Sequence, residues 1–167
     1  MQGSPFEPHL ILDSEDALEV VDEIKLLGLV VRSDLSWSSN TNTMCQKVFS
    51  RMWILRRLKG LGADREALLD TYNQQILSIV EFAAPVWTPG LTQSQAHQIE
   101  RVQKTAVRVI LGDSYTSYKQ GLALMKLEPI QQRRKRLCAK FTTKAISHPR
   151  FNTWFQTTEQ KKKQTIV

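Results

Sequence analysis

The chain has 167 residues, about the size of one domain; 41% are hydrophobic and 23% charged, so it can bury a core. No run of 18 apolar residues occurs, so no membrane-spanning helix is expected. Two cysteines and three histidines show neither disulfide nor metal-ligand spacing, and the first residues lack the pattern of a secretory signal. We expect an intracellular protein, nuclear or cytoplasmic, with no metal, no cofactor and no small-molecule substrate.

The formal net charge of +7 is distributed unevenly along the chain. Residues 1–50 hold three Lys and Arg against eight Asp and Glu, whereas residues 51–167 hold twenty against eight. A basic excess confined to one part of a chain indicates a polyanionic partner, with nucleic acid first and an anionic membrane second. The alternative is a well-solvated protein whose basic surface binds nothing.

The first 32 residues favour β-strands. Short β-favouring runs cover residues 9–12 and 18–21, and a third, nearly continuous in Leu, Val and Ile, covers residues 24–31. Gly28 interrupts the third run, which indicates a bulge or a close backbone approach. Two or three short strands cannot cover both of their faces. Either helices cover this meander, or it belongs to a larger sheet.

From Ser38 onward the apolar spacing is helical. The first helix is apolar almost all the way round, so we expect it to be central, and the glycines at positions 60 and 62 predict its end. Asp64 can cap a second helix, which Pro85 and Pro89 end or bend.

Three more helices are predicted over residues 92–112, 119–124 and 129–147, and Thr92 with Gln95 matches a capping box at the start of the first of these. The fold class is therefore mainly α, a bundle of about five helices with a small N-terminal antiparallel β meander. We divide the chain into a meander (1–37), a helical domain (38–155) and a mobile basic tail (156–167). Five aromatic residues are expected to pack inside: Trp37, Trp53, Tyr72, Trp87 and Phe141.

Two helices carry basic stripes. At 100° per residue, four side chains of the helix over 92–112 fall within about 60° of one another, and four of the helix over 129–147 fall within about 80°. The first stripe is His97, Arg101, Lys104 and Arg108, and the second is Arg133, Arg136, Lys140 and Lys144. Each spans about 16 Å, enough to follow several phosphates. Arg134 intrudes on the apolar side of its helix, so it must snorkel or the helix starts later.

We find no pattern for catalysis. The glycines near position 60 lack the rest of a phosphate-binding loop, and no serine lies in a nucleophile elbow. The acidic residues between positions 13 and 23 lie in turn-like sequence near a terminus, which cannot hold two metal ions rigidly. The sequence therefore predicts a protein that is not an enzyme.

Several segments, in order, resemble one family. Residues 25–31 (KLLGLVV) and 34–37 (DLSW) resemble the "YLG…LD…LSW" segment that closes the palm of LINE-type reverse transcriptases, which non-LTR retrotransposons of the jockey/CR1 kind encode. The resemblance covers roughly residues 8–155. Its other segments are 50–58 (SRMWILRRL), 79–87 (IVEFAAPVW), 99–106 (IERVQKTA), 110–112 (ILG) and 133–138 (RRKRLC).

The resemblance implies the end of a palm followed by a thumb. The family's polymerase acid pair would lie upstream, and this sequence contains no Asp-Asp pair. By this resemblance Lys25, Leu27 and Gly28 belong to the hairpin that holds the primer terminus. The thumb is expected to bind the backbone of an RNA–DNA hybrid or duplex without sequence specificity, beside the rest of a reverse transcriptase. Its expected ligands are Arg101, Lys104, Arg108, Arg133, Arg136, Lys140 and Lys144.

A second hypothesis stays open. The chain is then a protein-interaction module, or associates with itself, through an apolar surface that would face the palm. Its exposed residues would be Leu10, Leu12, Leu27 and Leu29.

Overall fold

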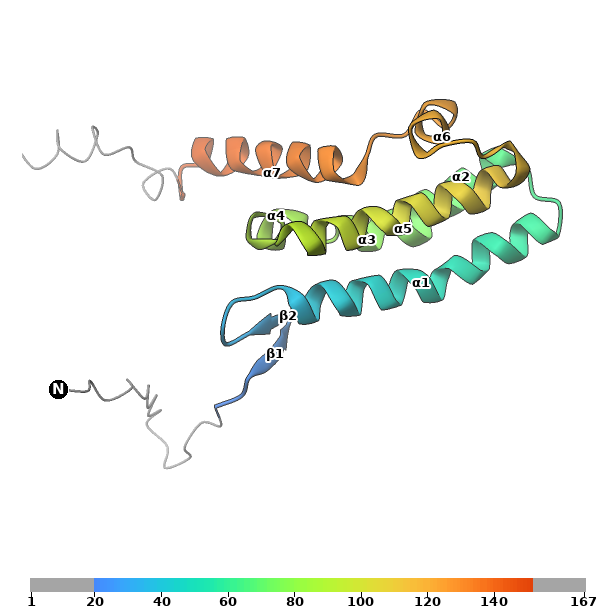
Figure 1. The fold of residues 1–167 in the computed structure, drawn as a ribbon. Helices are drawn as coiled ribbons and strands as arrows, with labels where there is room; N and C mark the ends of the chain where they lie inside the picture. The colour runs from blue at the N-terminus through green and yellow to red at the C-terminus, as the bar shows by residue number, and fades with distance from the viewer. Residues whose placement is uncertain (1–19, 152–167) are drawn as a thin grey trace, which may run out of the picture.

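The computed structural model describes residues 20–151, which form a helical bundle with a β-hairpin at one end (Figure 1). The expected mainly-α class is confirmed. The predicted strand at 9–12 and the tail at 156–167 lie outside the described residues. The strands are β1 (Glu23–Leu26) and β2 (Leu29–Arg32), and the longer helices are α1 (Ser38–Gly60), α2 (Arg65–Tyr72), α5 (Gln93–Leu111), α6 (Tyr118–Leu124) and α7 (Ile130–Ser147).

The second predicted helix is divided in the structure. A π-helical turn over Asn73–Leu77 joins α2 to α3 (Ser78–Glu81). After a left-handed Ala83 (φ 49°), α4 (Ala84–Trp87) follows and brings Pro85 into its first turn. Short 3₁₀ turns over Thr88–Gly90 and Gly112–Ser114 flank α5.

The helices are stacked around α5. In Figure 1, α1 lies below the layer of α3, α4 and α5, and α7 lies above it, while α5 packs against both α1 and α7. The stripe of α5 that faces this interior holds Ile99, Val102, Ala106 and Ile110, all buried. The core also includes residues of α1, of α2 through α4, of α6 with Met125 directly after it, and of the start of α7.

The hairpin corrects the expected third strand. Residues 24–31 are not one strand with a bulge but two strands joined by the two-residue turn Leu27–Gly28, whose φ angles are 47° and 89°. Two positive φ angles are those of a type I′ turn, which matches the twist of a hairpin. Gly28 lies against a side chain rather than another backbone segment, because a Cβ there would lie 3.2 Å from the Phe82 ring.

The predicted starts of α2, α5 and α7 and the predicted end of α7 are confirmed. The Asp64 carboxylate accepts from the Ala67 N–H at 2.8 Å. Thr92 and Gln95 form both bonds of a capping box. The last predicted helix starts at Ile130 directly after Pro129 and ends at Ser147.

Two aromatic predictions are wrong. Trp53 on α1 is 61% exposed and Phe141 on α7 is 58% exposed, whereas Tyr72 and Trp87 are fully buried and Trp37 packs against the core. Since Phe49 is also 45% exposed, α1 is covered on one side and is not central. Helical periodicity predicts which side of each helix is apolar. It does not show that this apolar side is wider than the surface of the neighbouring elements that cover it.

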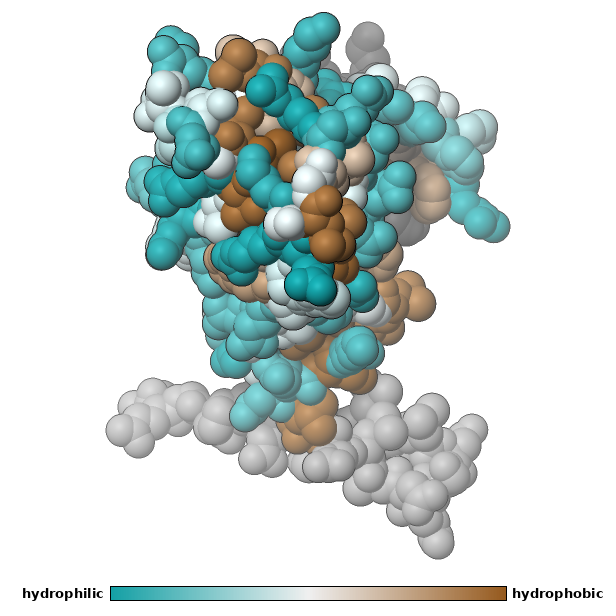
Figure 2. Space-filling view, turned by 90° about the vertical axis from the view of Figure 1, so that its right-hand side faces the viewer, coloured by the Kyte–Doolittle hydropathy of each residue, from teal (hydrophilic) through white to brown (hydrophobic). Residues whose placement is uncertain are grey.

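The surface is mostly polar at the end of the bundle where α1 turns into α2. Figure 2 views this end and shows hydrophilic side chains over most of it. Apolar side chains reach the surface between them, some of them low in the view at the height of the hairpin. Along residues 20–151 every helix is too short or too polar to cross a membrane.

Candidate nucleic-acid interface

The basic ridge of α5 is exposed. Arg101, Lys104 and Arg108 all lie on the surface, as does His97 one turn before them. The ion pairs found among residues 20–151 involve Arg32, Arg133 and Arg136, and none involves the α5 cations. Between residues 93 and 150 there are twelve Lys and Arg against three Asp and Glu, so the local excess of positive charge is large. The three α5 cations can therefore act on an external anion.

Two tyrosines hold this ridge in place. The Lys104 ammonium lies 5.3 Å from the centre of the Tyr118 ring, and the Arg108 guanidinium lies 5.1 Å from the centre of the Tyr115 ring. A cation over an aromatic face is attracted to it but keeps its hydrogen-bond donors free. Tyr115 lies between α5 and α6, and Tyr118 is the first residue of α6. Sequence spacing gave no signal for these contacts.

The predicted stripe on α7 is only partly available. Arg133 donates to both carboxylate oxygens of Glu81 on α3, the second bond being 3.3 Å long. This pairing raises the pKa of Arg133. Arg136 donates twice to one oxygen of Glu128, at 3.1 and 3.3 Å. Both arginines are held by acids of the same chain, so we no longer count them among the expected ligands.

The two lysines of the α7 stripe remain open. Lys140 and Lys144 are exposed on the second half of α7, which extends past α4 (Figure 1), and no acid of residues 20–151 pairs with them. Phe141 and Ile146, on the same half, are 58% and 49% exposed. This half of α7 lacks a covering surface within the described chain.

Arg134 departs most from expectation. Its side chain is 2% exposed, so it does not snorkel, and α7 does not start later. The guanidinium lies 5.6 Å from the centre of the Trp87 indole. Its Nε and Nη1 atoms are buried without a hydrogen-bond partner.

A buried glutamine fixes the start of α7 on α5. Gln103 is 1% exposed; its side-chain oxygen accepts from the Ile130 N–H at 2.9 Å, and its amide donates to the Glu128 carbonyl at 3.1 Å. One turn earlier, Glu100 accepts from the Gln131 N–H at 3.1 Å and from the Tyr118 hydroxyl. These bonds place the two basic helices relative to each other, and the sequence alone did not single them out.

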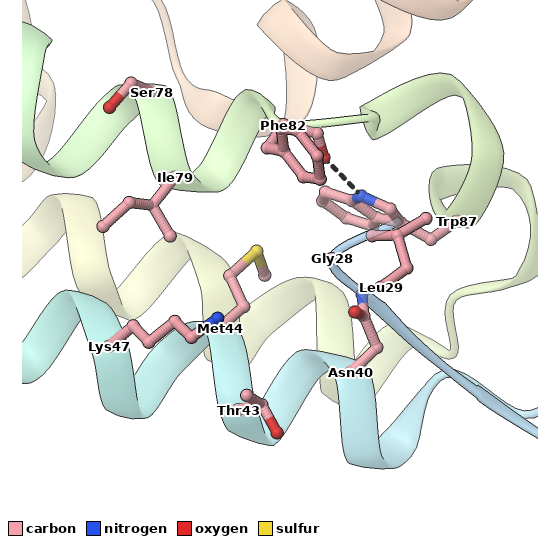
Figure 3. A pocket seen from close by; sticks show the side chains of 10 residues that line it. All are labelled: Gly28, Leu29, Asn40, Thr43, Met44, Lys47, Ser78, Ile79, Phe82 and Trp87. Carbon is pink, nitrogen blue, oxygen red and sulfur yellow. Dashed lines mark hydrogen bonds between the residues drawn. The ribbon is translucent and has the colours of Figure 1, made fainter. Parts of the chain in front are cut away.

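The three primer-grip-like residues gather on the hairpin. Lys25 is exposed in β1, Leu27 is 88% exposed at the tip, and Gly28 lies against the Phe82 ring. A cavity of ≈ 310 Å³ lies between this tip, α1 and α3. Figure 3 shows Ile79 and Phe82 above it and Met44 and Lys47 below, with the Trp87 indole N–H donating to the Phe82 carbonyl at 2.9 Å.

The structure does not bring the hairpin and the α7 lysines together. The hairpin packs on α1, whereas α7 lies across α4 and α5 from α1 (Figure 1). The α5 ridge, rather than all seven predicted residues, forms the continuous part of the candidate interface.

No group of three or more His, Cys, Asp or Glu side chains within residues 20–151 is arranged to hold a metal ion. The sequence matches no family model, and the comparisons with curated proteins and with solved structures found no match.

Proposed function

We propose that this chain binds the sugar–phosphate backbone of double-stranded nucleic acid without reading its sequence, as a thumb-like part of a reverse transcriptase, and does no chemistry itself. The observation that carries the proposal is the α5 ridge, in which Arg101, Lys104 and Arg108 are exposed and have no acid partner among residues 20–151. Phosphate contacts of this kind give affinity and orientation but no sequence preference.

The geometry of the ridge suits a phosphate chain. The first and last of the three cations, Arg101 and Arg108, are seven positions apart on one helix, a rise of about 10 Å at 1.5 Å per residue. Tyr115 and Tyr118 restrict the side chains beside them, which lowers the entropy lost when they bind. Lys140 and Lys144 extend the basic surface along α7. The resemblance to the end of a LINE-type palm and thumb agrees with this reading and adds the RNA–DNA hybrid as the expected ligand.

The test is a salt titration of binding. Fluorescence anisotropy of labelled duplex DNA is followed with the wild-type chain and with an Arg101→Glu, Lys104→Glu, Arg108→Glu triple variant. If the ridge contacts three phosphates, the slope of log K against log salt becomes shallower by about 2.7 in the variant. RNA–DNA hybrid and single strands are compared at two salt concentrations.

A matched control separates position from net charge. Arg51, Arg56 and Arg57 are exposed on α1, and no acid of residues 20–151 pairs with them. Their reversal to glutamate changes the net charge by the same amount but should leave most of the slope intact. If both triple variants lose the same slope, the α5 ridge is not the interface and the proposal fails.

Self-association is the second candidate, and a specific feature favours it. In this hairpin with a two-residue turn, Ile24↔Val31 and Leu26↔Leu29 are the hydrogen-bonded pairs. The backbone N–H and C=O groups of Glu23 and Lys25 therefore point away from β2. The outer edge of β2 is occupied, since the Val30 N–H donates to Asn40 at 3.2 Å. Within residues 20–151 no strand pairs with the outer edge of β1, and all four residues of β1 are exposed.

The occupant that this edge fits is a second copy of the chain. Antiparallel pairing of two β1 strands about Ile24 places each Glu23 opposite the Lys25 of the other copy, and both are residues with outward-pointing backbone groups. The two Ile24 side chains, 57% exposed in the single chain, then meet on the other face. Leu29, expected among the exposed residues, is instead half-buried against the core, and Leu10 and Leu12 lie outside the described residues.

Charge exchange tests this pairing. Sedimentation velocity should show a concentration-dependent dimer of the wild-type chain, a monomer for Lys25→Glu, and a recovered dimer for Glu23→Lys with Lys25→Glu. Dimers of the wild-type chain and of both variants, or a monomer of the wild-type chain at every concentration, would exclude this pairing. A monomer in which residues of its own N-terminus pair with the β1 edge would also contradict this pairing.

A further inference from the structure

A cavity of ≈ 360 Å³ lies where the N-terminus of α5 meets the first turns of α7. The side chains that matter for its chemistry are Thr88, His97, Arg134 and Lys135. Gln93, the first residue of α5, also lines it. None of the residues that form its wall within the described chain is acidic.

Two of the side chains that line this cavity carry buried donors without partners. Nε and Nη1 of Arg134 are buried and donate to no partner, and the residue as a whole is 2% exposed. The Thr88 hydroxyl is also buried and has no hydrogen-bond partner. In native proteins nearly all buried donors have a hydrogen-bond partner. Unpaired buried donors on two side chains at one cavity therefore indicate a bound group that the protein chain does not supply.

The charge of Arg134 is not balanced locally. An arginine stays protonated in proteins, so its burial is a cost that it cannot avoid by losing a proton. Burial lowers the pKa of Arg134, and Glu100 is the acid that opposes this effect. Glu100, however, is already hydrogen-bonded to the Gln131 N–H and the Tyr118 hydroxyl. The Trp87 ring covers one face of the guanidinium but carries no net charge.

The surroundings add positive potential. The N-terminus of a 19-residue helix, α5, lies beside the cavity, and a helix N-terminus carries a partial positive charge that attracts anions. Lys135 is exposed at the rim and can approach a bound anion from solvent. Water could satisfy the free donors, but it would leave the charge uncompensated.

We propose that this cavity is a binding site for a phosphate group, held by the Arg134 guanidinium and the Thr88 hydroxyl, with Lys135 and the N-terminus of α5 completing the positive environment. A guanidinium presents paired donors that match two oxygens of a phosphate. The site is separate from the α5 ridge proposed above, and it can exist whether or not that ridge binds nucleic acid.

The first experiment uses inorganic phosphate and no nucleic acid. The Tm of the wild-type chain is measured in phosphate, sulfate, acetate and chloride at equal ionic strength. Phosphate at ten times its Kd should raise the Tm by about 3–6 °C relative to chloride. Acetate should act less, because its carboxylate has two oxygens where phosphate has four and carries a smaller charge. Equal Tm values in phosphate and chloride would overturn the proposal.

Variants locate the effect. Arg134→Met should remove the phosphate response, and Thr88→Val and Lys135→Met should each weaken it. Arg65→Met is the matched control, since Arg65 is exposed at the start of α2 and does not line the cavity, and it should keep the full response. If Arg134→Met does not fold, Thr88→Val and Lys135→Met still decide the matter. A full response in both would refute the site.

Competition identifies the source of the phosphate. If the group belongs to a nucleic-acid backbone, inorganic phosphate weakens duplex binding by the wild-type chain more than by Thr88→Val at constant ionic strength. If it is a free anion, phosphate raises the Tm without competing. Both results support the site. A failure of the α5 triple variant to change duplex binding would disprove the proposed function and leave the Tm result intact.

Discussion

Replacing Gln103 by leucine should destabilise the bundle without removing volume from its core. The side chain is buried between α5 and the start of α7, where its amide joins the Ile130 N–H to the Glu128 carbonyl at 2.9 and 3.1 Å. Leucine has a similar size and no polar atoms. Both backbone groups then lose their partner while the helices stay packed around them.

The magnitude follows from those two groups. A buried donor or acceptor left without a partner costs about 1–3 kcal/mol. The Tyr118 hydroxyl also lies 2.6 Å from Gln103, but it keeps Glu100 as a partner and adds little. Two orphaned groups, offset in part by the added apolar surface of leucine, predict a loss of about 2–4 kcal/mol in the free energy of unfolding.

Urea denaturation followed by circular dichroism measures this loss. At 2–4 °C per kcal/mol, the Tm should fall by roughly 4–16 °C. Gln98→Leu is the control: its bond to Asn42 is exposed and 3.2 Å long, so the change should stay within about 0.5 kcal/mol. Equal stabilities of Gln103→Leu and the wild-type chain would refute the claim that this residue fixes α7.

Three further predictions concern the hairpin and the packing of α6. The Asp34 carboxylate accepts from the Ser36 N–H and pairs with an arginine of β2, which lowers its pKa to about 2. Its contribution to stability is therefore complete above pH 4 and lost as the pH falls to about 2; a midpoint near 3.8 in the Ser36 amide shift would contradict this. Gly28→Ala should cost about 1–2 kcal/mol, because its φ is 89°, and an unchanged urea midpoint would exclude that strain. Gly121→Ala should cost about 1–3 kcal/mol, since the new Cβ would lie 2.5 Å from a valine of α5, whereas Gly60→Ala, with nothing within 4 Å, should not destabilise; equal effects would argue against tight packing of α6.

Local sequence signals determined most of the secondary structure. The capping box at Thr92 and Gln95, the cap at Asp64 and the stripe of α5 act within a few residues, so the sequence alone predicted them, and the structure confirms them. The hairpin was harder. The turn residues Leu27 and Gly28 lie inside an apolar run, and leucine gives no turn signal, so the sequence predicts one strand where the structure has two.

Long-range contacts decided which predicted charges are available. Spacing on a helix placed Arg133, Arg136 and Lys140 on one stripe, but it could not show that Glu81, fifty-two positions before Arg133, reaches that stripe through the fold. The same holds for Arg134, which the packing of α7 against α4 buries beside Trp87. Helical periodicity fixes the direction of a side chain around its own axis. Whether that direction meets solvent, an acid or a buried cavity depends on which helix packs there, and only the tertiary structure supplies that neighbour.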